Sequence, residues 1–289
     1  IDPMDRTIRE AMKRFYPGLH NIADVKNLPR AFVSIKRLTY KCPRSGVTKD
    51  RKSDFKVGDW ILDSGAFTEI TQHGNYRQSV ETYARQIARW SLCGNLVAAV
   101  TQDFMCEPEM FEWISEDPET GEIRTEKERE ELAWQLGEPA GTSAAVHQLW
   151  TVDRYLSLVA AVRALGCDTY IMPTLQGYEP AEYVECIRMY EAAGALPHGA
   201  LCGVGSVCKR NSKPAAIREV LAAIRQARPD LRLHGFGLKV TALEDSEIRD
   251  ALESSDSMAW SLAARYEGRD GNDWREAKAY ADRVEALLN

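Results

Sequence analysis

The sequence predicts an α/β protein whose parallel strands close into a (β/α)8 TIM-like barrel. Short β-branched or apolar runs alternate along the chain with amphipathic helical stretches, which is typical of repeated strand–helix units. Each connection is long enough to hold a helix, as a parallel pair of strands requires. A length of 289 residues suits one such barrel. We therefore expect a single domain over residues 1–289, with a helical insertion at about residues 105–145.

Seven strands are predicted from short apolar runs that end in turn-forming residues. In chain order they cover residues 31–38, 59–67, 96–103, 169–177, 200–207, 232–239 and 255–260.

Amphipathic helices are predicted between these strands. Between Val80 and Trp90 the apolar residues recur at helical spacing, and the same spacing occurs around residues 146–159, 183–190, 217–224 and 274–287. Pro180 and Pro214 suit the first turns of two of these helices. A further helix is expected around Ile248, begun by a capping box over residues 241–244.

An open, doubly wound sheet is the competing topology. Its dinucleotide-binding fingerprint needs three glycines at fixed spacing. The turn that begins at Gly203 and Gly205 lacks the third glycine, and so does the turn at Gly235 and Gly237. The barrel is therefore the preferred interpretation.

Composition excludes the membrane, fibrous and disordered classes. Hydrophobic residues make up 44% of the chain and charged residues 28%, so that a sizeable core can be buried. The longest apolar runs, such as Leu96–Val100, are too short to span a bilayer. The first residues lack the apolar core of a signal peptide, and the seven cysteines are dispersed without a C-x-x-C pair. We expect a cytoplasmic protein with reduced thiols, no membrane partner, no metal site and no cofactor.

The net charge of −6 hides two opposed blocks. Residues 36–56 hold eight basic residues against two acidic ones, and residues 103–138 hold thirteen acidic residues against three basic ones. The basic block could contact a phosphate backbone, although a solvated loop would have the same composition. The candidate nucleic-acid contacts are Arg44, Lys49, Arg51, Lys52, Lys209 and Arg210.

Polar residues end most of the predicted strands, and in a barrel this is where the active site lies. Asp63, Asp103 and Gln176 each follow an apolar run, and Asp256 lies in the short seventh predicted strand. Any one of them could instead form a turn or cap a helix, and the nearby glycines could simply relieve crowding in tight turns. Three carboxylates and a carboxamide at one barrel mouth nevertheless suggest acid–base chemistry on a polar ligand.

Five motifs occur in the same order as in the tRNA-guanine transglycosylases, and they cover about residues 59–265. They are Asp63-Ser64-Gly65-Ala66-Phe67, Asp103 at a strand end, Leu175-Gln176-Gly177, Cys202-Gly203-Val204-Gly205, and Gly235-Phe236-Gly237 leading to Asp256. Three features depart from that family. The zinc-binding Cys/His cluster is absent, Ser206 stands where a Glu is usual, and the sequence around Asp256 differs. In these departures the chain resembles the DNA-modifying branch, the DpdA-type 7-deazaguanine DNA transglycosylases of phages and bacterial DNA-modification clusters.

This resemblance implies a base exchange that replaces guanine in DNA by a 7-deazaguanine. Asp256 is assigned as the nucleophile that forms a covalent Asp–sugar intermediate, as in retaining glycosidases. Asp63 is assigned as the general acid and base. The expected partners are DNA, the free base and further proteins of a modification system. The location would be the host cytoplasm if the gene belongs to a phage.

The resemblance also assigns the base-binding residues. Asp103 would accept hydrogen bonds from N1 and the 2-amino group, and Gln176 would donate to O6. The base edge and the 7-substituent would be contacted by Ser64, Gly177, Cys202, Gly203 and Gly205.

The neutral Ser206 bears on the substituent at position 7. Without a carboxylate there, a cationic aminomethyl group would lose its hydration without gaining a partner. This favours 7-cyano-7-deazaguanine or another neutral relative.

Three alternatives stay open from the sequence. The chain could act on tRNA without a zinc subdomain, or it could be a non-catalytic subunit that binds nucleic acid or base. A barrel that binds sugar phosphates through its glycines would leave Asp103 and Gln176 unexplained.

Overall fold

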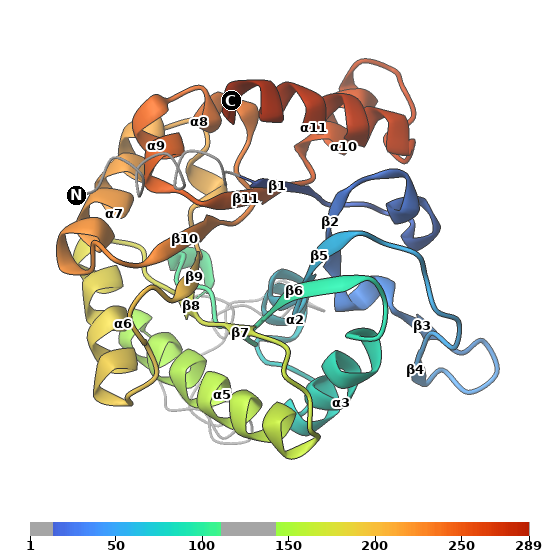
Figure 1. The fold of residues 1–289 in the computed structure, drawn as a ribbon, viewed down its shortest axis with the longest axis horizontal. Coiled ribbons are helices and arrows are strands. Elements are labelled where there is room, and N and C mark those ends of the chain that lie inside the picture. Colours follow the sequence, from blue (N-terminus) through green and yellow to red (C-terminus); the bar gives the residue numbers. More distant parts are fainter. Residues whose placement is uncertain (1–13, 111–142, 289) are drawn as a thin grey trace, which may run out of the picture.

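Two parallel sheets form the centre of the molecule (Figure 1). The computed structural model describes residues 14–110 and 143–288. The five-stranded sheet has the order β1 (Arg14–Pro17), β11 (Ser254–Ser257), β10 (Arg232–Gly235), β9 (Leu201–Val204) and β8 (Thr174–Leu175). The four-stranded sheet has the order β2 (Arg30–Ser34), β5 (Asp59–Asp63), β6 (Asn95–Val100) and β7 (Ile171–Met172). All neighbouring strands within these two sheets are parallel.

The two sheets meet at both of their sides. Only Pro173 separates β7 from β8, and proline has no backbone N–H to continue a ladder, so that one strand run becomes two. On the other side Gly18, just after β1, makes a parallel bridge with Phe32 of β2.

Helices surround the strands in Figure 1. The longer ones are α2 (Ala66–His73), α3 (Val80–Trp90), α5 (Ala144–Ala164), α6 (Pro180–Ala192), α7 (Pro214–Ala227), α10 (Ala259–Tyr266) and α11 (Trp274–Leu288). The shorter ones are η1 (Ile22–Asn27), η2 (Ile35–Arg37), η3 (Pro108–Met110), η4 (Cys208–Arg210), α8 (Val240–Leu243) and α9 (Ser246–Ala251). None of the helices in the described ranges is long and apolar enough to cross a membrane.

Buried apolar residues of the described ranges form three clusters, one of which contains Tyr76 and Phe104 and lies outside the two zones described next. The larger zone lies between strands and helices and includes the buried side chains of Trp60, Trp90 and Tyr183. A smaller cluster on the opposite strand faces contains Tyr16, Ile61, Ala98, Val100 and Met172. Both faces of the parallel sheets are therefore covered, as is usual for parallel sheets.

Each of the seven predicted strand regions contains a strand, and the mixed α/β class with parallel sheets is confirmed. The predicted strands extend too far at their C-terminal ends. The region predicted as 31–38 turns into η2 after Ser34, and the region predicted as 59–67 enters α2 at Ala66. In both places apolar residues resume after a short polar break, at Ser34 in the first region and at Asp63-Ser64-Gly65 in the second, and the helical turn begins there.

Several predictions differ from the structure. The strand β1 was not predicted, because four residues ending in Pro17 carry almost no periodic signal. The antiparallel hairpin of β3 (Thr39–Lys41) and β4 (Thr48–Asp50) lies in the predicted basic block and was also missed. The predicted capping box at 241–244 is wrong, because Asp245 caps α9 by accepting from the backbone N–H groups of Glu247 and Ile248. The predicted insertion falls mainly on residues 111–142, which lie outside the described residues.

Candidate active site

A cavity of about 630 Å3 opens at the C-terminal ends of the strands. Its walls include four carboxyl groups and one carboxamide from separate parts of the chain: Asp63, Asp103, Glu107, Gln176 and Asp256. The parallel register explains this convergence, since strand ends that are far apart in sequence meet at one edge.

Asp63 is the last residue of β5 and lies on the cavity wall. Burial raises its pKa to about 6, and the nearby charge of Asp256 acts in the same direction. Hydrogen bonds from the Ser34 hydroxyl and the Gly65 backbone N–H oppose this shift by stabilising the carboxylate. A carboxyl with this pKa can both donate and accept a proton near neutral pH.

Asp256 lies in β11 and is held by two donors. Its Oδ1 accepts from the backbone N–H of Gly237 at 3.1 Å and lies 3.3 Å from Nε2 of His234. Nδ1 of His234 lies 2.8 Å from the Ser254 hydroxyl. Both hydrogen bonds are made to Oδ1, and Oδ2 takes part in neither of them. The side chain is therefore oriented while one oxygen stays available for attack.

The imidazole of His234 is fully buried among aromatic rings. It stacks on Phe32, with ring centroids 5.7 Å apart and planes 11° apart, and contacts Phe236 edge-on. This packing fixes the ring that orients Asp256. The sequence analysis did not identify His234, although it stands directly before Gly235 at a predicted strand end.

Asp103 and Gln176 form the second polar pair of the cavity. Gln176 Nε2 donates to Asp103 Oδ2 at 2.5 Å. Burial raises the pKa of Asp103 to about 7, the bond from Gln176 opposes the shift, and the charge of Asp63 adds to it. A carboxylate beside a carboxamide matches the donor and acceptor pattern of a guanine edge.

Gly205 leaves the space that the Gln176 side chain occupies. A Cβ atom at position 205 would lie 2.4 Å from Gln176 Nε2. The glycine is therefore required for the close approach of the carboxamide, and it also lines the cavity.

A carboxyl group does lie beside Ser206. This corrects the sequence argument, which took the neutral side chain of Ser206 to mean that no carboxyl group was present there. Its hydroxyl lies 2.9 Å from Oε2 of Glu107, and Glu107 is buried in the same cavity wall. Glu107 comes from the segment after β6, ninety-nine residues away. It was missed because, in the sequence, it belongs to the acidic block and has no motif of its own.

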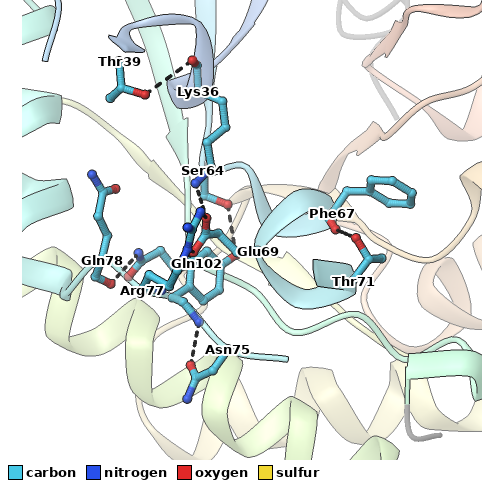
Figure 2. A network of polar contacts seen from close by, with 11 residues as sticks. Lys36, Thr39, Ser64, Phe67, Glu69, Thr71, Asn75, Arg77, Gln78 and Gln102 are labelled. Atoms are coloured by element: carbon cyan, nitrogen blue, oxygen red, sulfur yellow. Dashed lines mark hydrogen bonds and ion pairs between the residues drawn. The ribbon is translucent and has the colours of Figure 1, made fainter. Parts of the chain in front are cut away.

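A second ionic network lies beside the cavity. Figure 2 shows Lys36 and Arg77 converging on Glu69 of α2. Arg77 donates to Glu69 from Nη2 at 2.8 Å, from Nε at 3.2 Å and from its backbone N–H at 2.9 Å. Burial by itself would raise the pKa of Glu69, but the bonds from Arg77 and Lys36 outweigh it and lower the pKa to about 2. This network fixes Lys36, which also lines the cavity.

Four residues predicted to bind the base lie outside the described cavity lining: Ser64, Gly177, Cys202 and Gly203. The Ser64 hydroxyl lies 3.2 Å from the Tyr76 hydroxyl, which donates to the Asp103 carbonyl. Ser64 thus supports the loop of Asp103 from behind. Cys202 is fully buried in the larger core zone, and its thiol donates to the Ala200 carbonyl.

Gly177 and Gly203 are packing positions. A Cβ at Gly203 would lie 2.3 Å from the Phe236 ring, and one at Gly177 would lie 2.9 Å from Tyr183. Both glycines allow neighbouring aromatic rings to approach the backbone.

The predicted nucleic-acid contacts divide into two groups. Arg44, Lys49 and Lys52 are exposed on or beside the β3–β4 hairpin, and Arg51 donates to the Ser53 carbonyl. The hairpin follows η2, whose Lys36 and Arg37 line the cavity.

Lys209 and Arg210 lie on η4, next to the cavity-lining Cys208. The Arg210 guanidinium stacks over the Tyr178 ring at 4.3 Å and donates to the Tyr178 carbonyl. Arg210 is thereby held in one place.

Asp245 lies away from these groups. It caps α9 and pairs with Arg218. Within residues 14–110 and 143–288, no three His, Cys, Asp or Glu side chains form a group that could hold a metal ion.

Comparison with known proteins assigns the family. A search of curated proteins gave no match. The family model DpdA, described as DeoxyPurine in DNA protein A, matches residues 12–126 and 135–274, which is most of the chain. The chain therefore belongs to the DpdA family.

Proposed function

We propose that this protein is a base-exchange transglycosylase that replaces guanine in DNA by a 7-deazaguanine. The observation that carries the proposal is the meeting of Asp63, Asp103, Gln176 and Asp256 in one cavity of a DpdA-family chain. The family description, deoxypurine in DNA, supports DNA as the substrate. We also interpret the two sheets, which meet at Pro173 and at the Gly18–Phe32 bridge, as one eight-stranded barrel.

In the first half of the proposed reaction, Asp256 attacks the anomeric carbon of the deoxyribose. The bond from this carbon to N9 of guanine breaks, and its electron pair leaves with the base. Asp63 donates a proton to the departing guanine. The products are free guanine and DNA joined to Asp256 by an ester.

The second half reverses these steps with a different base. Asp63, now a carboxylate, removes the proton from N9 of the incoming 7-deazaguanine. N9 attacks the anomeric carbon, and the Asp256 carboxylate leaves. Atoms and charge balance without a cofactor, and the DNA strand stays intact.

The base would be held by Asp103 and Gln176. Asp103 offers acceptors to N1–H and the 2-amino group, and Gln176 keeps a second N–H for O6. A guanine within a duplex would have to be flipped out of the stack, because its anomeric carbon is otherwise inaccessible to the buried Asp256.

The proposal is tested by a base-exchange assay. The protein is incubated with guanine-containing DNA or with tRNA, together with 7-cyano-7-deazaguanine, and the digested nucleosides are analysed by mass spectrometry. We expect incorporation into DNA, and its loss in Asp63→Ala and Asp256→Ala. Asp245→Ala is the matched control, because this carboxylate only caps α9 and pairs with Arg218. Incorporation into tRNA alone would contradict DNA as the substrate, and a lack of exchange on both would contradict the activity.

A further inference from the structure

Four side chains form a continuous hydrogen-bonded chain along one wall of the cavity: Asp103, Gln176, Ser206 and Glu107. Asp103 Oδ2 lies 2.5 Å from Gln176 Nε2, Gln176 Oε1 lies 2.9 Å from Ser206 Oγ, and Ser206 Oγ lies 2.9 Å from Glu107 Oε2. All four residues are at least 95% buried. Ser206 has a positive φ of 55°, a conformation that non-glycine residues rarely adopt, so its place in the chain is maintained against backbone strain.

With both carboxyl groups ionised, this hydrogen-bonded chain has one hydrogen too few for its three contacts. Each of its three contacts needs one hydrogen between two heavy atoms. The carboxamide of Gln176 can donate to only one side, because its other end is an oxygen, and Ser206 has one hydroxyl hydrogen. Two ionised carboxylates would supply none, so that one contact would join two bare acceptors. One carboxyl proton completes the chain.

This proton count does not depend on how the Gln176 amide is oriented. In the orientation given above, Gln176 donates to an ionised Asp103, Ser206 donates to Gln176, and a protonated Glu107 donates to Ser206. With the amide turned over, a protonated Asp103 donates to Gln176, Gln176 donates to Ser206, and Ser206 donates to an ionised Glu107. In both arrangements Ser206 also accepts the backbone N–H of Cys106, at 3.1 Å.

The surroundings favour one shared proton over two negative charges. The ionisable groups packed around the chain are the Asp63 carboxyl, the phenols of Tyr76, Tyr83, Tyr183 and Tyr190, and the thiols of Cys106, Cys186 and Cys208. Burial raises the pKa of each of these phenols and thiols, so that they stay neutral and offer no compensating charge. The cations beside the cavity and beside these phenols have other partners. Lys36 pairs with Glu69, and Arg37 lies 3.2 Å from His20 Nδ1. Arg154 donates to Gln102 Oε1, and Arg210 donates to the Tyr178 carbonyl.

The order of the chain also matches the perimeter of a 7-deazaguanine. Around such a base, the N1 and 2-amino edge is followed by O6 and then by the substituent on C7. With Asp103 at the first edge and Gln176 at O6, Ser206 and Glu107 come next, on the side of C7.

From this chain we propose that Asp103 and Glu107 share a single proton through Gln176 and Ser206, and that Glu107 is a specificity-determining residue for the C7 substituent. When Asp103 is ionised to accept N1–H and the 2-amino group, Glu107 is neutral. A neutral C7 substituent then fits beside it, whereas an ammonium group lacks a negative partner. The proposal rests on the base exchange proposed above. Like the sequence analysis, the proposal predicts a preference for the nitrile. The reason is now the neutral form of Glu107 and not the neutral side chain of Ser206.

Competition between two bases tests the proposal. DNA and protein are incubated with equal amounts of 7-cyano- and 7-aminomethyl-7-deazaguanine, and the incorporated nucleosides are quantified between about pH 6 and about pH 8, where an alkylamine stays protonated. We expect a preference of about tenfold for the cyano base at the acidic end. The preference should fall as pH rises, because the hydrogen-bonded chain then loses its shared proton and its wall of the cavity becomes more negative.

Variants separate Glu107 from other causes. Glu107→Gln should abolish the pH dependence of the ratio, since a carboxamide cannot ionise. Ser206→Ala should shift the ratio by about tenfold toward the aminomethyl base, because it releases Glu107 from Asp103. Glu185→Gln, the same change at an exposed position on α6, should keep the wild-type dependence. A wild-type preference for the aminomethyl base that disappears in Glu107→Gln would overturn the proposal.

Infrared spectroscopy gives a readout that needs no exchange activity. At neutral pH the wild-type protein should show the carbonyl stretch of a protonated carboxyl. Glu107→Gln should remove it, because the introduced amide then supplies the missing hydrogen and Asp103 ionises. A band that keeps its full intensity in Glu107→Gln, or is missing from the wild type, would overturn the shared proton. If neither base is incorporated while the band behaves as expected, the exchange reaction fails and the shared proton stands.

Discussion

At the scale of single residues, the chemistry of the cavity depends on which carboxyl groups hold protons. Asp63, Asp103 and Gln176 could be identified from the sequence because each stands at the end of an apolar run. Asp256 follows two serines within β11 and was assigned from the family resemblance. Their meeting in one cavity follows from the parallel register. His234 and Glu107 were missed, because their roles come from contacts across twenty-two and ninety-nine residues that no local pattern shows.

The pKa of Asp63 predicts the pH dependence of guanine release. Asp63 must be protonated to donate, and burial raises its pKa to about 6. We therefore expect the single-turnover rate of guanine release to fall as pH rises through about 6. Ser34→Ala removes a bond that stabilises the carboxylate, so that the fall should move to higher pH. A rate that rises through this range, or a midpoint that moves to lower pH in Ser34→Ala, would contradict the role of Asp63 as the acid.

Gly205→Ala should weaken binding of the free base. The φ of Gly205 is not positive, so that alanine can adopt the backbone conformation, but its Cβ would displace the Gln176 amide. We expect the Kd for 7-cyano-7-deazaguanine, measured by calorimetry, to rise about tenfold or more. The melting temperature of the variant serves as the control for folding. Unchanged affinity in a folded Gly205→Ala protein would show that Gln176 does not contact the base.

At the scale of elements, the β3–β4 hairpin connects the base site to the proposed DNA surface. The basic composition of this segment was evident in the sequence, but its hairpin was not, since its two strands of three residues are almost entirely exposed and have no apolar alternation. The hairpin follows η2, which contributes Lys36 and Arg37 to the cavity wall. DNA held by the hairpin would therefore lie close to the mouth of the cavity.

Charge reversal on the hairpin should weaken DNA binding and leave base binding unchanged. Each phosphate contact that is lost should reduce the slope of log Kd against log salt by about 0.9 for a duplex or about 0.7 for a single strand. The test variant is Arg44→Glu, Lys49→Glu, Lys52→Glu, measured by fluorescence anisotropy at several salt concentrations. A matched triple reversal on α11, Arg275→Glu, Lys278→Glu, Arg283→Glu, should have a much smaller effect. Equal losses of DNA affinity in the two variants would show that binding depends on the net charge of the protein and not on a surface at the hairpin.

At the scale of the whole molecule, the first and last described segments close the fold together. β1 pairs with β11, the Phe15 and Tyr280 rings lie 5.9 Å apart, and Trp260 Nε1 donates to the Gly18 carbonyl at 2.8 Å. Helix positions between Val80 and Ala227 were predictable from periodicity. This closure was not, because it depends on a short strand whose stability comes from its partners.

Trp260→Ala tests this closure through stability. The side chain is 2% exposed, and its removal should lower the free energy of unfolding by about 3–5 kcal/mol. Urea denaturation provides the measurement. Tyr266→Ala on the same helix is the control, because Tyr266 is 82% exposed and its loss should change stability by about 0.5 kcal/mol or less. Similar losses in both variants would show that the contact between Trp260 of α10 and Gly18 does not contribute to stability.

The central claim is that Asp256 forms a covalent bond to the deoxyribose of the target guanine. The most direct measurement is intact mass spectrometry of protein incubated with a guanine-containing oligonucleotide and quenched in denaturant, followed by peptide mapping. The account predicts a species with the mass of protein plus DNA minus guanine, mapped to Asp256 and absent from Asp256→Asn. An adduct on another residue, or base exchange that persists in Asp256→Asn, would contradict it.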